Sequence, residues 1–250
     1  MKKSFEVTFG PVYGGYRNEE TILWATGHFL LIPAGAFYTC RKRGSSTHRR
    51  LAVITKPFLM QETPVTQGQY QAIAGTNPAV WKGNLDNPVE MVNWNDAVAF
   101  AETLSQKKGL KFRLPTEMEW EYAARGGDGD KYTYAGSNNI DEVAWYRDNS
   151  GYRDNSDGRV HPVKQKKPNG YGLYDMTGNV WEWCSDKFAP YPNQELIDYR
   201  GAESSDYRIS RGNSWYDTVD YMPLTIRNGN YPDHSMHNLG FRLVLEAPKE

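Results

Sequence analysis

Few side chains in this sequence could carry redox or metal chemistry. Cys40 and Cys184 are the only cysteines among the 250 residues. The two thiols could form a disulfide or stay apart as buried thiols, and the sequence does not decide between these arrangements. Neither cysteine lies in a metal-binding spacing, and the five histidines are scattered without paired helical spacing. The sequence therefore gives no indication of thiol or histidine-metal chemistry.

Three carboxylates, Glu117, Glu119 and Glu121, stand close enough in sequence to suggest acid–base chemistry. Thr116 and Glu119 match a capping box, in which each side chain accepts a hydrogen bond from the other residue's backbone amide. The other two glutamates suit the positive end of a helix, where carboxylates are favoured. We therefore interpret all three as builders of a short helix that stops at Gly126, and not as a catalytic group.

Two helical patterns and several strand patterns surround these residues. Thr66 suits the N-cap of a helix over residues 67–74, which Gly75 ends. A second helix is predicted to start within residues 93–96 and to run through residue 107, with a buried face formed by Ala97, Phe100, Ala101 and Leu104. Strands are predicted over residues 5–9, 22–33, 36–40, 51–54, 180–183 and 240–245. In the last strand, one face carries Phe241, Leu243 and Leu245, and the other carries Arg242.

The composition is that of a globular domain with many turns. The chain is 39% hydrophobic and 14% aromatic, which is enough for one domain with a sizeable core. A net charge of −1 gives no field that would attract nucleic acid or a membrane surface. No apolar run approaches membrane-spanning length, and no apolar signal-peptide region follows the basic start. We divide the chain into an N-terminal strand or extension, residues 1–27, and a main domain, residues 28–250.

A series of motifs resembles the formylglycine-generating-enzyme (sulfatase-modifying factor) domain, a divergent C-type lectin fold. The motifs include Arg113-Leu114-Pro115-Thr116-Glu117, Asn169-Gly170-Tyr171-Gly172-Leu173, Gly178-Asn179-Val180-Trp181-Glu182-Trp183, Arg211-Gly212-Asn213-Ser214-Trp215 and Gly240-Phe241-Arg242. They occur in family order over about residues 30–246. The resemblance implies an α+β, C-type lectin-like fold with two helices, twisted and mostly antiparallel sheets and long ordered loops. By itself it implies no reaction.

The enzymes of this family oxidise a substrate cysteine with two active-site cysteines that hold copper, shortly after a Gly-Gly-Ser-Trp/Tyr motif. The corresponding residues here, 216–222, contain no cysteine, and Asp or Tyr cannot replace a thiolate as nucleophile or soft-metal ligand. We therefore predict no catalytic residues and no enzyme activity. Three alternatives remain: such an oxidase, an iron-dependent sulfoxide synthase that needs a His-rich helical partner domain, and a structural domain without a selected ligand.

The same resemblance implies a calcium site at the turn before the Trp-x-Trp strand. Its ligands would be the carbonyl oxygens of Gly178 and Val180 and the side chain of Glu182, which is a suitable set for a hard cation. The alternative is that Glu182 bonds to backbone or to an arginine. We expect a structural role for any calcium bound there and no other cofactor.

The last segment gives a closer resemblance, to variable proteins diversified by retroelements, of the Treponema variable protein type. In these proteins template Asn codons mutate at adenines, so the reachable residue types exclude Trp, Lys, Glu, Gln and Met. Residues 216–238 contain no Trp, Lys, Glu or Gln. Met222 and Met236 must then be fixed or come from other codons, and Asn213 departs from the usual second glycine of its motif.

From this resemblance we predict a non-catalytic protein that displays a diversified binding surface on residues 213–238, called the variable segment below. Tyrosines offer a large contact area and lose little side-chain conformational entropy on binding, and Asp, Asn, Thr and His supply adaptable hydrogen bonds. The predicted ligand-binding residues are Asn213, Tyr216, Asp217, Thr218, Asp220, Tyr221, Ile226, Asn228, Gly229, Asn230, Tyr231, His234 and His237.

The expected partner is an unidentified protein or other macromolecule, with no role for nucleic acid, and the chain is expected to be a monomer. The resemblance also implies display at a bacterial cell surface through a lipid anchor.

Overall fold

Short strands and long connections dominate the structure, as the glycine and proline content predicts. The computed structural model describes residues 4–8, 26–43, 46–152 and 158–246. Within them, three sheets and a few helices form an α+β fold, so the predicted fold class is confirmed.

The largest sheet has five strands in the order β1-β2-β5-β12-β6. These are β1 (Ser4–Thr8), β2 (Thr26–Ile32), β5 (Phe58–Gln61), β12 (Val244–Leu245) and β6 (Phe112–Arg113). Each neighbouring pair is antiparallel. Residues 4–8 and 244–245 therefore belong to one sheet, and the boundary we placed after residue 27 falls inside β2. Phe9 and residues 22–25, which we assigned to strands, lie outside the described residues.

The other two sheets are smaller and each contains one parallel pair. One has the order β10-β9-β7-β11, with β10 (Asn228–Asn230), β9 (Arg208–Arg211), β7 (Trp181–Lys187) and β11 (Leu239–Gly240), and β11 runs parallel to β7. The third has the order β3-β4-β8, with β3 (Gly35–Arg43), β4 (Ser46–Ile54) and β8 (Leu196–Ile197), and β8 runs parallel to β4.

The predicted helices are confirmed, because their start and stop signals are local. They are α2 (Gln67–Ala74), α3 (Trp94–Lys108) and α4 (Glu117–Ala124), followed by the four-residue α5 (Ile140–Val143). All of the first three begin with a capping box, and the box of Thr116 and Glu119 is the predicted one. The family resemblance implies two helices, whereas the described residues contain four α-helices, of which α5 is a single turn.

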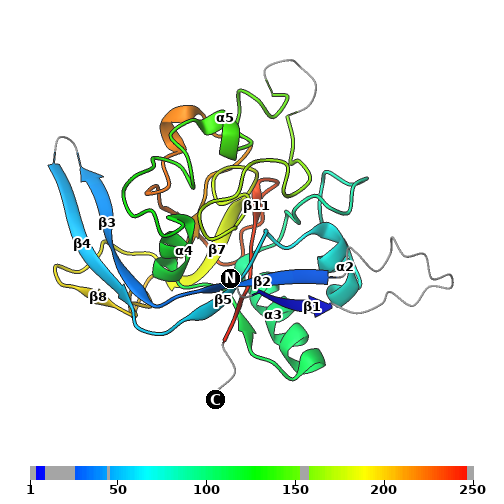
Figure 1. Cartoon of the computed structure of the whole chain (residues 1–250). Coiled ribbons are helices and arrows are strands. Elements are labelled where there is room, and N and C mark those ends of the chain that lie inside the picture. The colour runs from blue at the N-terminus through cyan, green and yellow to red at the C-terminus, as the bar shows by residue number, and fades with distance from the viewer. Residues whose placement is uncertain (1–3, 9–25, 44–45, 153–157, 247–250) are drawn as a thin grey trace.

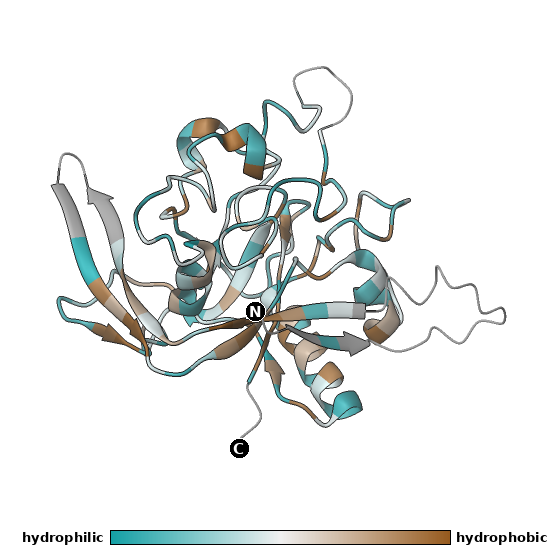
Figure 2. Cartoon of the chain, viewed as in Figure 1, coloured by the Kyte–Doolittle hydropathy of each residue, from teal (hydrophilic) through white to brown (hydrophobic). Residues whose placement is uncertain are grey.

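The core has two main parts. In the larger one, α2 and α3 pack on the five-stranded sheet, and Tyr70, Phe100 and Phe241 bring their rings within 5.2–6.3 Å of one another. In the second, Trp120 of α4 packs against β7 and β9 with Cys184 and Ile209. Figure 1 shows most of the irregular connections on the side of β7 and β11 that carries α5. Figure 2 shows that these connections are mostly hydrophilic, whereas hydrophobic colour concentrates where β2 and β5 cross the centre.

One strand prediction is wrong. Residues 240–245 do not form a single strand: β11 pairs with β7, and β12 belongs to the five-stranded sheet. The chain changes sheet at Arg242, because its guanidinium bonds to Glu182 and to carbonyl oxygens of three other residues, Gln61, Glu62 and Tyr174. Arg242 is fully buried and does not face away from the core.

Cys184 is a free thiol buried in β7, and Cys40 lies in β3. Burial and the nearby Asp186 and Glu117 carboxylates raise the pKa of Cys184 well above its usual value. This thiol is therefore a poor nucleophile and a poor metal ligand at neutral pH. Among the described residues, no helix combines the length and apolar character needed to cross a bilayer.

Candidate binding surface

The variable segment is held from inside the protein by a buried arginine. Arg211 ends β9 and has no exposed surface. Its guanidinium donates to the carbonyl oxygens of Leu224, Thr225 and Ile226 at 3.1, 3.2 and 2.8 Å. The same group pairs with Glu121 of α4 at 2.6 Å, a buried carboxylate. These contacts fix the middle of the variable segment on α4.

A second arginine anchors the segment one residue further on. Arg227 donates to both carboxylate oxygens of Glu117, at 2.5 and 2.7 Å, and its guanidinium stacks 3.8 Å from the Tyr191 ring. The Tyr191 hydroxyl also donates to Glu117, at 2.9 Å. Our interpretation of Glu117 and Glu121 as residues that merely favour a helix end is therefore incomplete. They are internal counter-ions for Arg211 and Arg227. Their i, i+4 spacing puts both on one face of α4, but only the structure shows that this face is buried.

The third buried pair lies at the proposed calcium turn. Both carboxylate oxygens of Glu182 accept hydrogen bonds from Arg242 at 2.7 Å, and one also accepts from the Trp120 indole at 2.8 Å. Arg242 already neutralises this carboxylate, so a calcium ion would have to displace it. Gly178 and Val180 lie in the turn just before Glu182. The calcium site therefore stays a prediction, and the arginine partner we kept as the alternative is the one present.

Within the described part of the chain, no group of three or more His, Cys, Asp or Glu side chains is placed to hold a metal ion.

The turn that starts the variable segment is built by its own polar side chains. Gly212 and Asn213 both have positive φ, 96° and 62°, which explains why a second glycine suits this position and why asparagine is tolerated. The Asn213 side chain is fully buried and donates to the Tyr221 carbonyl. Asp217 accepts from the Ser214 amide and hydroxyl at 2.8 and 2.6 Å. Asn213 is thus not part of the exposed surface, and Asp217 is committed to the turn.

Three of the four large apolar or aromatic side chains exposed in the variable segment are tyrosines. Tyr216, Tyr221 and Tyr231 are 43%, 62% and 43% exposed. Of the eight large apolar or aromatic side chains exposed among the described residues, four belong to this segment, the fourth being Val219. This concentration along one stretch of chain marks the segment as a candidate contact surface. We call Tyr216, Tyr221 and Tyr231 the tyrosine surface.

Around Tyr216, aromatic rings from other parts of the chain extend this surface. Tyr216 makes edge contacts with Tyr152 at 5.4 Å and with His237 at 6.0 Å between ring centroids. The guanidinium of Arg147 lies 4.5 Å from the Tyr152 ring and 5.8 Å from that of Tyr216. Trp215 below them is buried, with its ring edge-on to Tyr216. The sequence analysis missed Arg147 and Tyr152, because they lie far from the variable segment in sequence.

A second group surrounds Tyr231. Its ring lies 4.5 Å from the Tyr207 ring, the two hydroxyls form a 3.0 Å hydrogen bond, and His234 contacts the other side at 5.5 Å. Tyr207 is itself exposed and precedes β9. The sequence analysis missed Tyr207, because nothing in the residues around it links it to the variable segment.

The remaining predicted residues take two kinds of position. Thr218, Asp220, Asn228, Asn230 and His237 are exposed or half-buried, as are His234 and Ile226, and Asn228 and Asn230 lie in β10. Gly229 lies against Phe188, and a β-carbon added there would stand 2.9 Å from that ring. Met222 is fully buried against Ile140, Ala144 and Tyr146, and Met236 packs on the larger core. Both methionines therefore occupy positions where the fold constrains the side chain.

These features place the chain in a known family. Residues 18–247 match the sulfatase-modifying factor enzyme 1-like domain, and the chain belongs to that family. The fold is that of C-type lectin-like proteins related to formylglycine-generating enzymes, as the motifs implied.

The names of individual relatives describe an enzyme, an inactive enzyme and a chaperone protein. The chain is 38% identical to the formylglycine-generating enzyme of Streptomyces coelicolor, over 66% of this chain and 54% of that one. It is 35% identical to the inactive Cα-formylglycine-generating enzyme 2 of Mus musculus, over 75% and 58%. It is 32% identical to the chaperone protein LppX of Paenibacillus barcinonensis, over 83% and 87%. The chain thus spans just over half the length of the two formylglycine-generating relatives.

Among solved structures, the chain closely resembles Treponema denticola variable protein 1. The TM-score is 0.82 at 31% identity, and the match covers 98% of this chain and 99% of that one. The resemblance to a variable protein that the last segment suggested is therefore confirmed at the level of the whole fold.

Replacement of Arg211 by Met should cost about 3–5 kcal/mol of folding free energy, because three carbonyl oxygens and Glu121 lose a buried partner. Urea unfolding followed by circular dichroism measures this loss. The matched control is Arg49→Met, which removes an exposed pair with Asp130 and should cost less than about 1 kcal/mol. Equal effects of the two substitutions would contradict the anchoring role of Arg211.

Two buried acids, Glu90 and Asp186, should make stability depend on pH. Burial raises the pKa of Glu90 to about 7, and burial with the nearby Glu117 raises the pKa of Asp186 to about 7. Below about pH 3 both groups are mostly protonated whether the chain is folded or unfolded. Between there and pH 7 the folded chain binds more protons, so the stability they contribute is lost as pH rises through 7.

The double variant Glu90→Gln, Asp186→Asn should flatten this dependence. Relative to the variant, the wild type should lose up to about 6 kcal/mol between pH 4.5 and 8, about 3 kcal/mol for each acid, as measured by urea unfolding at each pH. A wild-type stability that rises with pH relative to the variant would show that these acids are ionised in the folded state.

Proposed function

We propose that this protein is a non-catalytic binding protein that presents the tyrosine surface, with its flanking polar residues, to a macromolecular ligand. The observation that carries the proposal is the separation of roles within the variable segment. Backbone carbonyls, Met222 and Asn213 face inward and are fixed, whereas Tyr216, Tyr221 and Tyr231 face solvent. Side chains on such a support can be exchanged without loss of the fold.

The chemistry of this surface favours a protein ligand. Exposed tyrosines contribute large contact areas at low entropic cost and are common at binding hot spots. The Asn, Asp, Thr and His side chains between them supply adaptable hydrogen bonds. The similarity to Treponema denticola variable protein 1 supports the same interpretation, since it extends over the whole of both chains.

The non-catalytic part of the proposal follows from the residues that take the place of the family's cysteine pair. Residues 216–222 contain Tyr216, Asp217 and Tyr221 where an oxidase would need thiolates. Cys184 cannot substitute, because it is buried in β7 and its raised pKa keeps it protonated. A relative named as inactive shows that loss of activity occurs within this family.

We also propose display at a bacterial cell surface through a lipid anchor, and a monomeric chain. Both parts extend the resemblance to variable proteins. A rigid domain whose contact residues gather on one segment suits such display, because the ligand meets that segment without rearrangement of the fold.

Simultaneous replacement of Tyr216, Tyr221 and Tyr231 by Ala should remove ligand binding and leave the fold intact. The labelled full chain is screened on a panel of purified extracellular and bacterial surface proteins, and each saturable interaction is then measured by biolayer interferometry. We expect the triple variant to bind at least about 100-fold more weakly, as for the loss of central hot spots. Its melting temperature should change by a few degrees at most, because all three side chains are exposed.

Tyr38→Ala is the matched control, since Tyr38 is similarly exposed but lies on β3. It should leave affinity unchanged, whereas Tyr207→Ala should weaken binding by an intermediate amount through its contact with Tyr231. An unchanged affinity in the triple variant would exclude the tyrosine surface as the binding site.

A further inference from the structure

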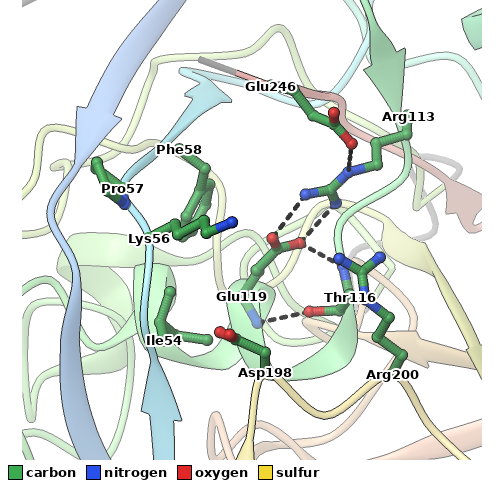
Figure 3. A pocket seen from close by; sticks show the side chains of 10 residues that line it. All are labelled: Ile54, Lys56, Pro57, Phe58, Arg113, Thr116, Glu119, Asp198, Arg200 and Glu246. Atoms are coloured by element: carbon green, nitrogen blue, oxygen red, sulfur yellow. Dashed lines mark hydrogen bonds and ion pairs between the residues drawn. The ribbon is translucent and has the colours of Figure 1, made fainter. Parts of the chain in front are cut away.

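A cavity of about 410 Å³ opens on another part of the molecule and is not used by the proposed function. It lies between the β4–β5 connection, the start of α4, the chain after β8 and Glu246, which follows β12. The residues that line it include Lys56, Pro57, Arg113, Glu119, Asp198 and Arg200. Figure 3 shows their side chains around the open space. The volume falls in the range of small-molecule sites.

One wall of the cavity is rigid and electrically balanced. Arg113 donates to both carboxylate oxygens of Glu119 at 2.7 Å and to Glu246 at 3.2 Å. Lys111 also pairs with Glu246, at 2.8 Å. Two cations thus face two carboxylates, and this wall carries no net charge. Figure 3 shows the Arg113–Glu119–Glu246 group as a connected set on one side of the space.

The rest of the rim carries charge that is not balanced. Asp198 accepts two hydrogen bonds from Thr55, and the positive charges of Arg200 and Lys56 help to hold its pKa below the usual value. Lys56 and Arg200 themselves have no carboxylate within ion-pair distance among the described residues. The rim therefore has two cations for one fixed carboxylate, and in Figure 3 the Lys56 ammonium points into the space.

We propose that this cavity binds small organic anions, in which a carboxylate or phosphate group meets Lys56 and Arg200 and an apolar body lies along Pro57. Both cations can donate charge-assisted hydrogen bonds to such a group. Ile54 and Phe58, both buried, line the cavity together with Pro57 and give it apolar surface. Because the Arg113–Glu119–Glu246 wall is already paired, the ligand does not have to break an ion pair on entry.

Isothermal titration of the full chain with phenyl phosphate, benzoate and benzylamine tests this proposal. The two anions should bind with dissociation constants at or below ~1 mM, and the cation of the same size should not bind. The stronger of the two anions identifies the preferred group. No saturable binding of either anion at ~10 mM would overturn the proposal.

Matched variants distinguish binding in the cavity from a general effect of the protein's positive charge. The double variant Lys56→Ala, Arg200→Ala should bind the anion at least about 10-fold more weakly than the wild type. The single variant Lys56→Arg, which keeps both positive charges, should bind it nearly as well as the wild type. Lys107→Ala with Lys108→Ala removes the same charge from the end of α3 and should change nothing. Equal losses in the two double variants would overturn the proposal. Neither outcome depends on the tyrosine surface, so this site and the proposed function can fail separately.

Discussion

The arrangement of the binding surface depends on the burial of arginine guanidinium groups against carboxylates of α4 and β7. A guanidinium without a counter-ion is very costly in a protein interior, so Arg211, Arg227 and Arg242 require Glu121, Glu117 and Glu182. The geometry of a guanidinium adds a second constraint, since its remaining N–H groups must also find acceptors. The two terminal nitrogens of Arg211 find such acceptors in carbonyl oxygens of the variable segment. Satisfying one buried charge therefore fixes the path of an irregular stretch of chain.

This constraint explains how a segment with little regular structure can present defined side chains. The carbonyls of residues 224–226 point at Arg211, Met222 fills a small apolar cluster with α5, and β10 adds only three residues to β9. The interior contacts are made by backbone atoms and by a few buried side chains. The exposed tyrosines contribute little to holding the fold together. Their identity can change while the support remains, which is the physical requirement for a diversified surface.

The parts of the fold that the sequence predicted are those specified by neighbouring residues. The three longer helices carry their capping residues within three positions, and the buried face of α3 follows from its period. The parts that could not be predicted depend on distant partners. Glu121 and Arg211 are 90 positions apart, Glu117 and Arg227 are 110 apart, and Arg242 meets a glutamate 60 positions before it. Neither the split between β11 and β12 nor the role of Tyr207 has a local signal. In the variable segment, residue types identified the tyrosines, but burial of Asn213 and the contact of Gly229 with Phe188 needed coordinates.

The central claim is that the fold fixes some positions of residues 213–238 and leaves others free to vary, and sequencing the same locus from several isolates tests it most directly. The account predicts substitutions at exposed positions such as Tyr216, Tyr221 and Tyr231, with Asn213, Met222 and Gly229 unchanged and the rest of the chain nearly constant. Uniform sequences across the segment, or substitutions spread evenly over buried and exposed positions, would contradict it.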